Sequence, residues 1–150
     1  MIAGTGSGCG KTTVTLAVLR AMQRRNIPLA AFKCGPDYID PMFHKAVLGI
    51  PSRNLDLFFI SEREVRGQIV RSIPQNGIGV IEGVMGFYDG VSGTTDTASA
   101  AHLARETGTP AILVVRPKGQ SLSLAAMLSG FRNFAENTLC GVILNGISDT

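Results

Sequence analysis

The chain has 150 residues, 45% of them hydrophobic and 17% charged, which excludes an intrinsically disordered protein and suits one domain with a buried core. The net charge of +3 is small and the only clustered basic run is Arg24-Arg25, so we expect no nucleic-acid partner. No apolar stretch reaches the roughly 18 residues of a membrane span and the N-terminus shows no secretory signal, so we expect no membrane partner.

The chain begins with a glycine-rich loop that runs into a helical pattern. Only residues 1–3 precede the loop, which is too short for the strand that normally feeds such a loop. A helix is expected to start near Gly10 and to stop before Asn26, because apolar residues recur at helical spacing between these points. A continuous apolar run then predicts a buried strand at residues 29–34.

The middle of the chain repeats this alternation. Ser61 and Glu64 have the spacing of a capping box, so a helix is expected to follow Ser61. A second buried strand is predicted at residues 78–82. The next helix is expected to begin near Asp96 and to end at Gly108, just before a proline.

The last third adds a strand at residues 111–115, a helix at 122–134 and a strand at 141–145. Strands that alternate with helices predict an α/β fold with a mainly parallel sheet covered by helices on both faces. Ligands of such sheets bind at the carboxyl ends of the strands. Because another helix would be expected after the last strand, and because the start is so short, we interpret the chain as part of a larger protein.

The opening stretch AGTGSGCGKTT, residues 3–13, predicts a phosphate-binding loop and hence a three-layer fold of the P-loop NTPase type. Backbone N–H groups of such a loop and the positive end of the following helix attract phosphate. Lys11 would reach the β/γ-phosphates and the Thr12 hydroxyl would bind Mg²⁺. The spacing is G-x5-G-K-T, one residue longer than the usual form. The residues expected to bind a nucleoside triphosphate here are Gly6, Gly8, Gly10, Lys11, Thr12 and Thr13.

The stretch FKCGPDYIDP follows the strand at residues 29–34 and carries Lys33 at the end where ligands bind. Two carboxylates, Asp37 and Asp40, flank Tyr38. A surface turn with solvated aspartates would have a similar composition. A buried lysine beside a phosphate loop is harder to dismiss, because an unpaired one is costly.

The stretch VIEGVMGFYDG places Glu82 at the end of an apolar strand, a position suited to a Mg²⁺ ligand or to a carboxylate that orients metal-bound water. A solvated carboxylate at the strand end is the alternative. Asp89 closes a turn in the same stretch. His44 and His102 each stand alone without ligand spacing, so neither is assigned a role.

The three cysteines, Cys9, Cys34 and Cys140, are widely spaced and form no CxxC pair or Cys/His cluster. Reduced thiols in a cytoplasmic protein are therefore expected, rather than a metal site or a disulfide framework.

Two stretches together resemble a known family. The phosphate loop resembles that of dethiobiotin synthetase, and KCGPDYIDP with EGVMGFYDG resembles, more specifically, the cobyrinate a,c-diamide synthase family of cobalamin biosynthesis. The resemblance extends to GQSLSLAAMLSGF and GVILN. It implies that residues 1–150 are a truncated N-terminal ATP-dependent amidoligase domain, dethiobiotin synthetase-like, and that a C-terminal glutamine amidotransferase domain is absent from this chain.

The resemblance implies a ligase that forms C–N bonds with ATP and Mg²⁺. ATP would phosphorylate the a and c acetate side chains of cobyrinate, and ammonia from a glutaminase domain would displace phosphate from each acyl phosphate. The implied partners are a corrinoid polycarboxylate and that glutaminase domain; a homodimer is left open.

The resemblance also implies roles for single residues. Lys11 and Lys33 would steady the phosphoryl oxygens, and Asn145 would contact adenine. The implied metal ligands are Thr12, Asp37 and Glu82. The implied catalytic residues are Lys33, Asp37, Asp40, Glu82 and Asp89, and the implied substrate-binding residues are Tyr38, Ile39 and Asp40. Arg116 and Gly146 depart from the family pattern, which often has Asp and Arg at these positions.

Other functions remain open at this point. Hydrogenobyrinate or a nickel sirohydrochlorin would offer acetate side chains to the same machinery. A nucleotide switch or partition ATPase is a different class, but such proteins carry an early loop lysine where this chain has Gly6. Dethiobiotin synthetase itself is disfavoured by the GPDYIDP stretch.

Overall fold

The computed structural model describes residues 1–147 and contains a six-stranded parallel sheet with strand order β3-β2-β4-β1-β5-β6. In chain order the elements are β1 (Ile2–Gly4), α1 (Lys11–Gln23), β2 (Leu29–Cys34), α2 (Ile39–Leu48), β3 (Ser52–Leu55), α3 (Glu62–Ser72), β4 (Ile78–Glu82), α4 (Ala100–Thr107), β5 (Ala111–Val115), α5 (Leu122–Asn133) and β6 (Leu139–Leu144).

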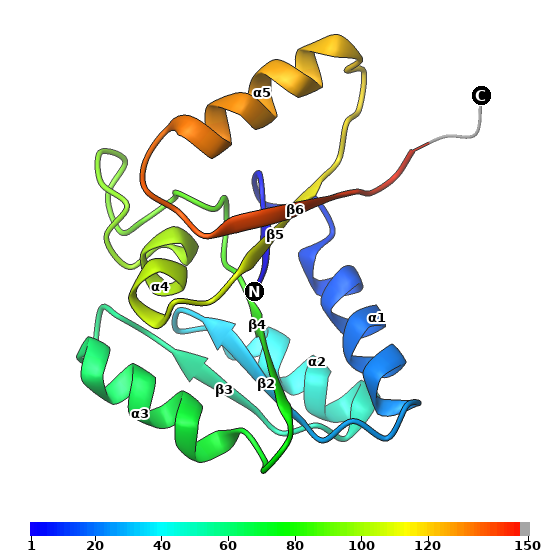
Figure 1. Cartoon of the computed structure of the whole chain (residues 1–150), viewed down its shortest axis with the longest axis vertical. Helices are drawn as coiled ribbons and strands as arrows, with labels where there is room; N and C mark the ends of the chain where they lie inside the picture. The colour runs from blue at the N-terminus through cyan, green and yellow to red at the C-terminus, as the bar shows by residue number, and fades with distance from the viewer. Residues whose placement is uncertain (148–150) are drawn as a thin grey trace.

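Helices cover both faces of the sheet, as the sequence predicted, and Figure 1 shows α1 and α2 on one side with α3 and α4 on the other. Successive strand residues point to opposite faces, so neighbouring side chains enter different cores. Ala31 and Val80 pack with Leu19 of α1 and Leu48 of α2. The alternate strand residues Phe32 and Ile81 pack on the other face, in one cluster with Val65 of α3, Leu103 of α4 and Leu128 of α5. The three-layer α/β prediction is confirmed.

The strand β1 corrects the expectation that too few residues precede the phosphate loop. Its three residues, Ile2–Gly4, are all buried and lie between β4 and β5 in the sheet. The backbone N–H of Ile112 donates to the carbonyl of Met1, which extends the pairing. A central strand can be this short because the strands on both sides form hydrogen bonds with it.

The sequence also missed α2 and β3. Pro36 and Pro41 suggested a stiff loop, but Pro41 lies in the first turn of α2, where its missing N–H is not needed. The strand β3 reads Ser-Arg-Asn-Leu and lies at the edge of the sheet. An edge strand buries less surface than a central one, so it gave no apolar run for the sequence to reveal.

The helix α4 begins at Ala100 rather than near Asp96. Ala98 has a φ of 60°, which interrupts a helix, and the Ser99 side chain caps the new start by accepting from the N–H of His102. Asp96 instead pairs with Arg105 of α4 at 2.9 Å. The capping box of Ser61 and the three remaining helix placements agree with the sequence to within a residue or two.

The carboxyl ends of β1, β2 and β4 lie together because these strands are parallel and adjacent in the order β2-β4-β1. In the register, Glu82 of β4 stands beside Lys33 of β2 and Ile2 of β1. The connections from β1 to β2 and from β4 to β5 run to opposite sides of the sheet here. Ligands of open parallel sheets bind at such a switch in strand order. Within residues 1–147, no helix has the length and apolar character needed to cross a membrane.

Candidate functional site

The phosphate loop connects β1 to α1 and is shaped by glycines. Gly8 has a φ of 74° and Gly10 has a φ of 101°, a region that favours glycine over other residues. The helix α1 starts at Lys11, so its free N–H groups and positive end face the loop. The Lys11 ammonium donates to the carbonyls of Gly6 at 2.9 Å and Met85 at 2.6 Å, which holds it across the mouth of the loop.

Thr12 connects the loop to β4. Its hydroxyl donates to Oε1 of Glu82 at 2.6 Å, and Glu82 is 0% exposed. The Thr12 hydroxyl, Glu82, Asp37 and Asp40 line one hollow of about 360 Å³ together with Lys11 and residues of the loop. These donors are all oxygens, the ligands that Mg²⁺ prefers. The residues present therefore fit a magnesium ion held with a nucleotide.

Lys33 is the centre of the charged cluster. Its ammonium lies 2.5 Å from Oδ2 of Asp40, 3.3 Å from Oε1 of Glu82 and 3.8 Å from Oδ2 of Asp37, and it donates to the carbonyl of Gly83 at 3.0 Å. The residue is only 3% exposed. Three carboxylates thus share one buried cation, which is the pairing that burial of Lys33 requires.

The charges of the site are set by burial and by these contacts. Burial opposes the charged form of Glu82, but the hydrogen bond from His44, the charge of Lys33 and the Thr12 hydroxyl outweigh it, so the pKa of Glu82 lies below its usual 4.5. Burial also opposes the charge of Lys33, but Asp40 and Glu82 raise its pKa. For Lys11, burial prevails and lowers the pKa. Glu82 and Lys33 are therefore held as an ion pair.

His44 joins the site although sequence reasoning gave it no role. It is 0% exposed, and its Nε2 lies 2.9 Å from Oε2 of Glu82 while Nδ1 lies 2.9 Å from Oγ of Ser52. One signal could have found it. Asp40 and His44 are four residues apart, so in a helix they share a face; the two prolines of this segment had favoured a loop instead.

The substrate-binding residues predicted from the resemblance lie next to this hollow. Tyr38 is 80% exposed, and it lines a neighbouring hollow of about 340 Å³ with Ile39 and Asp37. Asp37 and Val84 belong to both hollows. A substrate resting on Tyr38 and Ile39 would thus adjoin the phosphate loop.

Asp89 lies apart from the other predicted catalytic residues. Its carboxylate accepts the N–H of Gly86 at 2.8 Å and lines a separate hollow formed by the 85–96 segment. Met85 borders both this hollow and that of the phosphate loop. The catalytic role of Asp89 stays a prediction.

Asn145 follows β6 and lies against the phosphate loop. Its side-chain amide donates to the carbonyl of Cys9 at 2.9 Å, which leaves the amide oxygen for a further partner. Gly146 has a φ of 71°, and Arg116 packs so close to it that a Cβ there would lie 3.3 Å from Nε. The two residues that depart from the family pattern are therefore neighbours beside Asn145.

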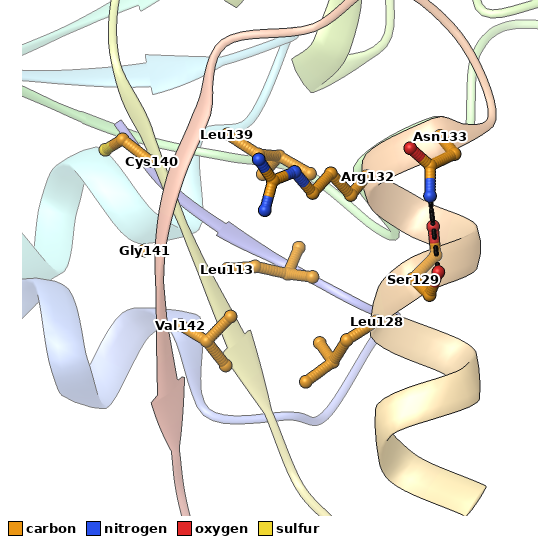
Figure 2. Close-up of a pocket in the computed structure, with 9 residues that line it drawn as sticks. All are labelled: Leu113, Leu128, Ser129, Arg132, Asn133, Leu139, Cys140, Gly141 and Val142. Atoms are coloured by element: carbon orange, nitrogen blue, oxygen red, sulfur yellow. Dashed lines mark hydrogen bonds between the residues drawn. The ribbon is translucent and has the colours of Figure 1, made fainter.

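A larger hollow of about 830 Å³ lies away from this chemistry, between α5 and the strands β5 and β6. Figure 2 shows Leu113, Leu128 and Val142 facing the space, with Arg132 at its side. It contains no residue of the phosphate loop or of the charged cluster. Size alone therefore does not mark the site in the described part of the chain.

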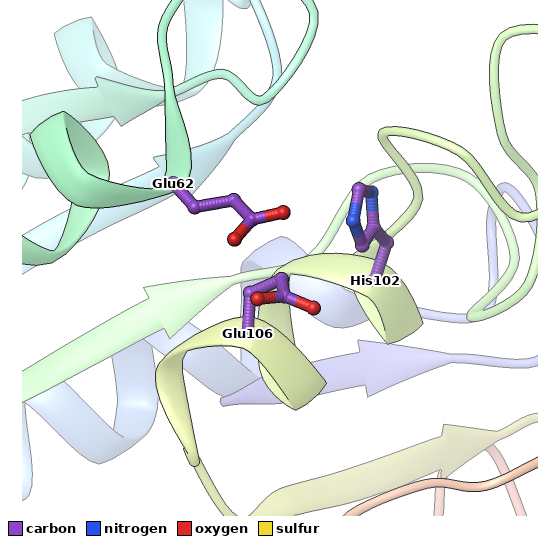
Figure 3. A group of neighbouring side chains, drawn as sticks. All are labelled: Glu62, His102 and Glu106. Carbon is purple, nitrogen blue, oxygen red and sulfur yellow. The ribbon is translucent and has the colours of Figure 1, made fainter.

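A second group of polar side chains joins α3 and α4, where Glu62, His102 and Glu106 point toward one another (Figure 3). The Arg66 guanidinium already bonds both carboxylates, at 3.1 Å and 3.4 Å. His102 accepts the N–H of Ala98 at Nδ1, so its proton is on Nε2, the nitrogen that would have to bind a metal. This group is a surface ion-pair network with its own cation.

The fold and the loop define an α/β nucleotide-binding domain of the P-loop type. The chain belongs to the CobQ/CobB/MinD/ParA nucleotide binding domain family, whose model matches residues 1–150.

Similar proteins narrow this class. The chain is 41% identical to a cobyrinate a,c-diamide synthase of Clostridium tetani over 150 residues, which are 100% of this chain and 34% of the relative. It is 46% identical to that of Salmonella typhimurium, over 99% of the chain and 32% of the relative. For Clostridium acetobutylicum the identity is 48%, over 99% of the chain and 34% of the relative. The chain thus spans about a third of the length of these curated relatives.

Proposed function

We propose that this domain carries the ATP-dependent step of a cobyrinate a,c-diamide synthase. One observation supports the proposal above the others: the buried carboxylate of Glu82 bonds both Thr12 of the phosphate loop and Lys33 of the acidic segment. This contact joins the phosphate loop to the segment that carries Lys33 and the two aspartates, next to the exposed side chains of Tyr38 and Ile39. The named relatives supply the substrate class, a corrinoid with acetate side chains.

The proposed reaction activates a carboxylate, because a carboxylate is a poor electrophile. A substrate carboxylate oxygen attacks the γ-phosphorus of ATP, the bond to the β-phosphate oxygen breaks, and ADP leaves. Ammonia then attacks the acyl carbon, phosphate leaves with the bonding electrons, and the nitrogen loses a proton to give the amide. Repeating the sequence gives the a,c-diamide.

Each residue of the site has a part in this proposal. Lys11 and Lys33 neutralise charge on the transferred phosphoryl group, since phosphoryl transfer depends on positioning and charge stabilisation. Thr12, Glu82 and Asp37 would hold Mg²⁺, which supplies Lewis-acid stabilisation of the phosphates when bound. Asp40, whose carboxylate contacts Lys33, would meet the incoming carboxylate or ammonia.

The remaining parts of the proposal concern partners. Ammonia would come from a glutaminase domain, and the reaction would take place in the cytoplasm. No glutaminase step is assigned to residues 1–147 of this chain, and a homodimer is a further arrangement that size measurement in solution would test.

The test uses the full-length natural protein with ATP, Mg²⁺ and either glutamine or ammonia. Cobyrinate, hydrogenobyrinate and nickel sirohydrochlorin are supplied in separate reactions, and mass spectrometry follows the conversion of acid to amide. We expect two amides on cobyrinate and ADP formed with each amide. Amidation of one of the other tetrapyrroles alone would reassign the substrate. No amide on any of them, while the nucleotide binds, would refute the proposed function.

A further inference from the structure

A chain of hydrogen bonds beside the phosphate loop joins four elements, β3, α2, β4 and α1. Ser52 at the start of β3 contacts Nδ1 of His44 in α2 at 2.9 Å, and Nε2 of His44 contacts Oε2 of Glu82 in β4 at 2.9 Å. The other oxygen of Glu82 contacts the Thr12 hydroxyl at 2.6 Å. His44 and Glu82 are both 0% exposed.

The direction of these bonds follows from the chemistry of the groups. A carboxylate can only accept, so Nε2 of His44 must carry the proton that it donates to Glu82. Nδ1 is then paired with the Ser52 hydroxyl, which donates to a neutral ring and accepts from a protonated one. The Glu82 carboxylate thus fixes the proton on Nε2, and Ser52 holds the other side of the ring.

The two oxygens of Glu82 have separate tasks. His44 contacts Oε2, whereas Thr12 and Lys33 contact Oε1. A carboxylate with one oxygen fixed by a rigid ring cannot rotate freely, so Oε1 stays turned toward the phosphate loop. Such partners behind a metal-binding carboxylate orient it and tune its affinity.

Packing alone does not explain a histidine at this position. A fully buried imidazole must have its polar atoms satisfied, and a leucine would fill the space at lower cost. The helix α2 already anchors itself to the sheet through Leu48, which belongs to the apolar core. The polar partners of His44 in the described residues are Ser52 and Glu82, and the second belongs to the site.

We propose that His44, oriented by Ser52, is a positioning residue that holds the Glu82 carboxylate with Oε1 facing Thr12, and so sets the geometry in which the metal–nucleotide complex binds. The proposal rests on the proposed function for its consequence in catalysis. Its structural consequence is that loss of His44 weakens the binding of the divalent ion, and this does not depend on which carboxylate is amidated.

The experiment compares four variants of the full-length protein with the unaltered protein. His44→Leu removes the donor, His44→Gln places an amide donor near the former Nε2, and Ser52→Ala removes the hydrogen-bond partner that holds Nδ1. Leu48→Ala is the matched control, because it damages packing on the same buried face of α2 without touching Glu82. Mn²⁺ affinity is measured by electron paramagnetic resonance with a non-hydrolysable ATP analogue, and kcat and KM for ATP are measured separately.

We expect His44→Leu to weaken Mn²⁺ binding by about ten- to a hundredfold and to lower kcat with it. His44→Gln should recover most of the lost Mn²⁺ affinity. The Mn²⁺ affinity of Ser52→Ala should lie between those of His44→Leu and the unaltered protein. The affinity for nucleotide without metal should be the same in all of them. Leu48→Ala should lower the melting temperature while keeping the metal affinity of the unaltered protein.

Equal metal affinity and kcat in His44→Leu and the unaltered protein would overturn the proposal, and so would losses in Leu48→Ala that match those in His44→Leu. If His44→Leu does not fold, an unchanged Ser52→Ala would overturn it. The Mn²⁺ measurement contains no tetrapyrrole. If only the proposed function is wrong, the unaltered protein would still bind Mn²⁺ with the nucleotide and His44→Leu would still bind it more weakly, but no amide would form. The two failures are thus distinguished.

Discussion

Replacing Lys33 with methionine tests how the charged cluster is held together. The change removes a cation that faces Asp40 at 2.5 Å, Glu82 at 3.3 Å and Asp37 at 3.8 Å. The side chains of Asp40 and Asp37 are 18% and 30% exposed, so water can partly replace the lost charge there. Glu82 is fully buried, so water cannot replace the lost charge there.

The loss of folding free energy in Lys33→Met therefore comes mainly from Glu82. Removing one partner of a buried ion pair costs about 3–5 kcal/mol, and the partial exposure of the aspartates favours the lower end. At about 2–4 °C per kcal/mol for a domain of this size, Lys33→Met should lower the melting temperature by roughly 6–12 °C.

A second substitution shows whether the loss comes from the unpaired charge of Glu82. Glu82→Gln in the Lys33→Met background removes the unpaired charge, so the double variant should be more stable than the sum of the two single losses allows. Thermal unfolding followed by circular dichroism, without metal or nucleotide, compares the unaltered protein with the two single variants and the double variant. Additive losses would refute the claim that Glu82 depends on Lys33 for compensation.

Three further predictions concern binding, pH and thiol reactivity. Lys11→Ala should abolish ATP binding and amidation, whereas Asp40→Asn should lose amidation and keep ATP affinity by calorimetry; equal losses of ATP affinity would contradict this division. Because folding lowers the pKa of Glu82, its stabilisation is complete above the usual 4.5 and is lost as the pH falls through the folded-state value. Urea unfolding of Glu82→Gln should therefore show a shallower acid decline than the unaltered protein, and parallel curves would count against it. Iodoacetamide should alkylate exposed Cys140 but not Cys34, whose pKa burial raises to about 12, and mass spectrometry of native protein that finds Cys34 modified first would disprove this.

Much of the fold could be predicted because its central strands are continuous apolar runs. The strands β2, β4 and β5 have the expected bounds, since burial on both faces leaves a clear pattern in the sequence. The edge strand β3 left no such pattern, and the three-residue β1 is held by its neighbours rather than by its own length.

The site could be predicted where one stretch of sequence carries the chemistry. Lys33 and Glu82 each stand at the end of a predicted strand, the phosphate loop is recognisable from its glycines and the Gly-Lys-Thr that ends it, and parallel pairing brings all three together. The contact of His44 with Glu82 needed a helix that proline had obscured and a strand that supplies Ser52. A contact between elements that the sequence does not reveal cannot be read from spacing.

The central claim is that the loop delivers a phosphoryl group to a substrate carboxylate, and the transfer of heavy oxygen tests it most directly. Cobyrinate with heavy-oxygen-labelled carboxylates is supplied to the full-length protein with ATP, Mg²⁺ and ammonia, and the released phosphate is examined by mass spectrometry. We expect one labelled oxygen in the phosphate for each amide formed, because the acyl–oxygen bond breaks when ammonia displaces phosphate. Amide formation with unlabelled phosphate would contradict it.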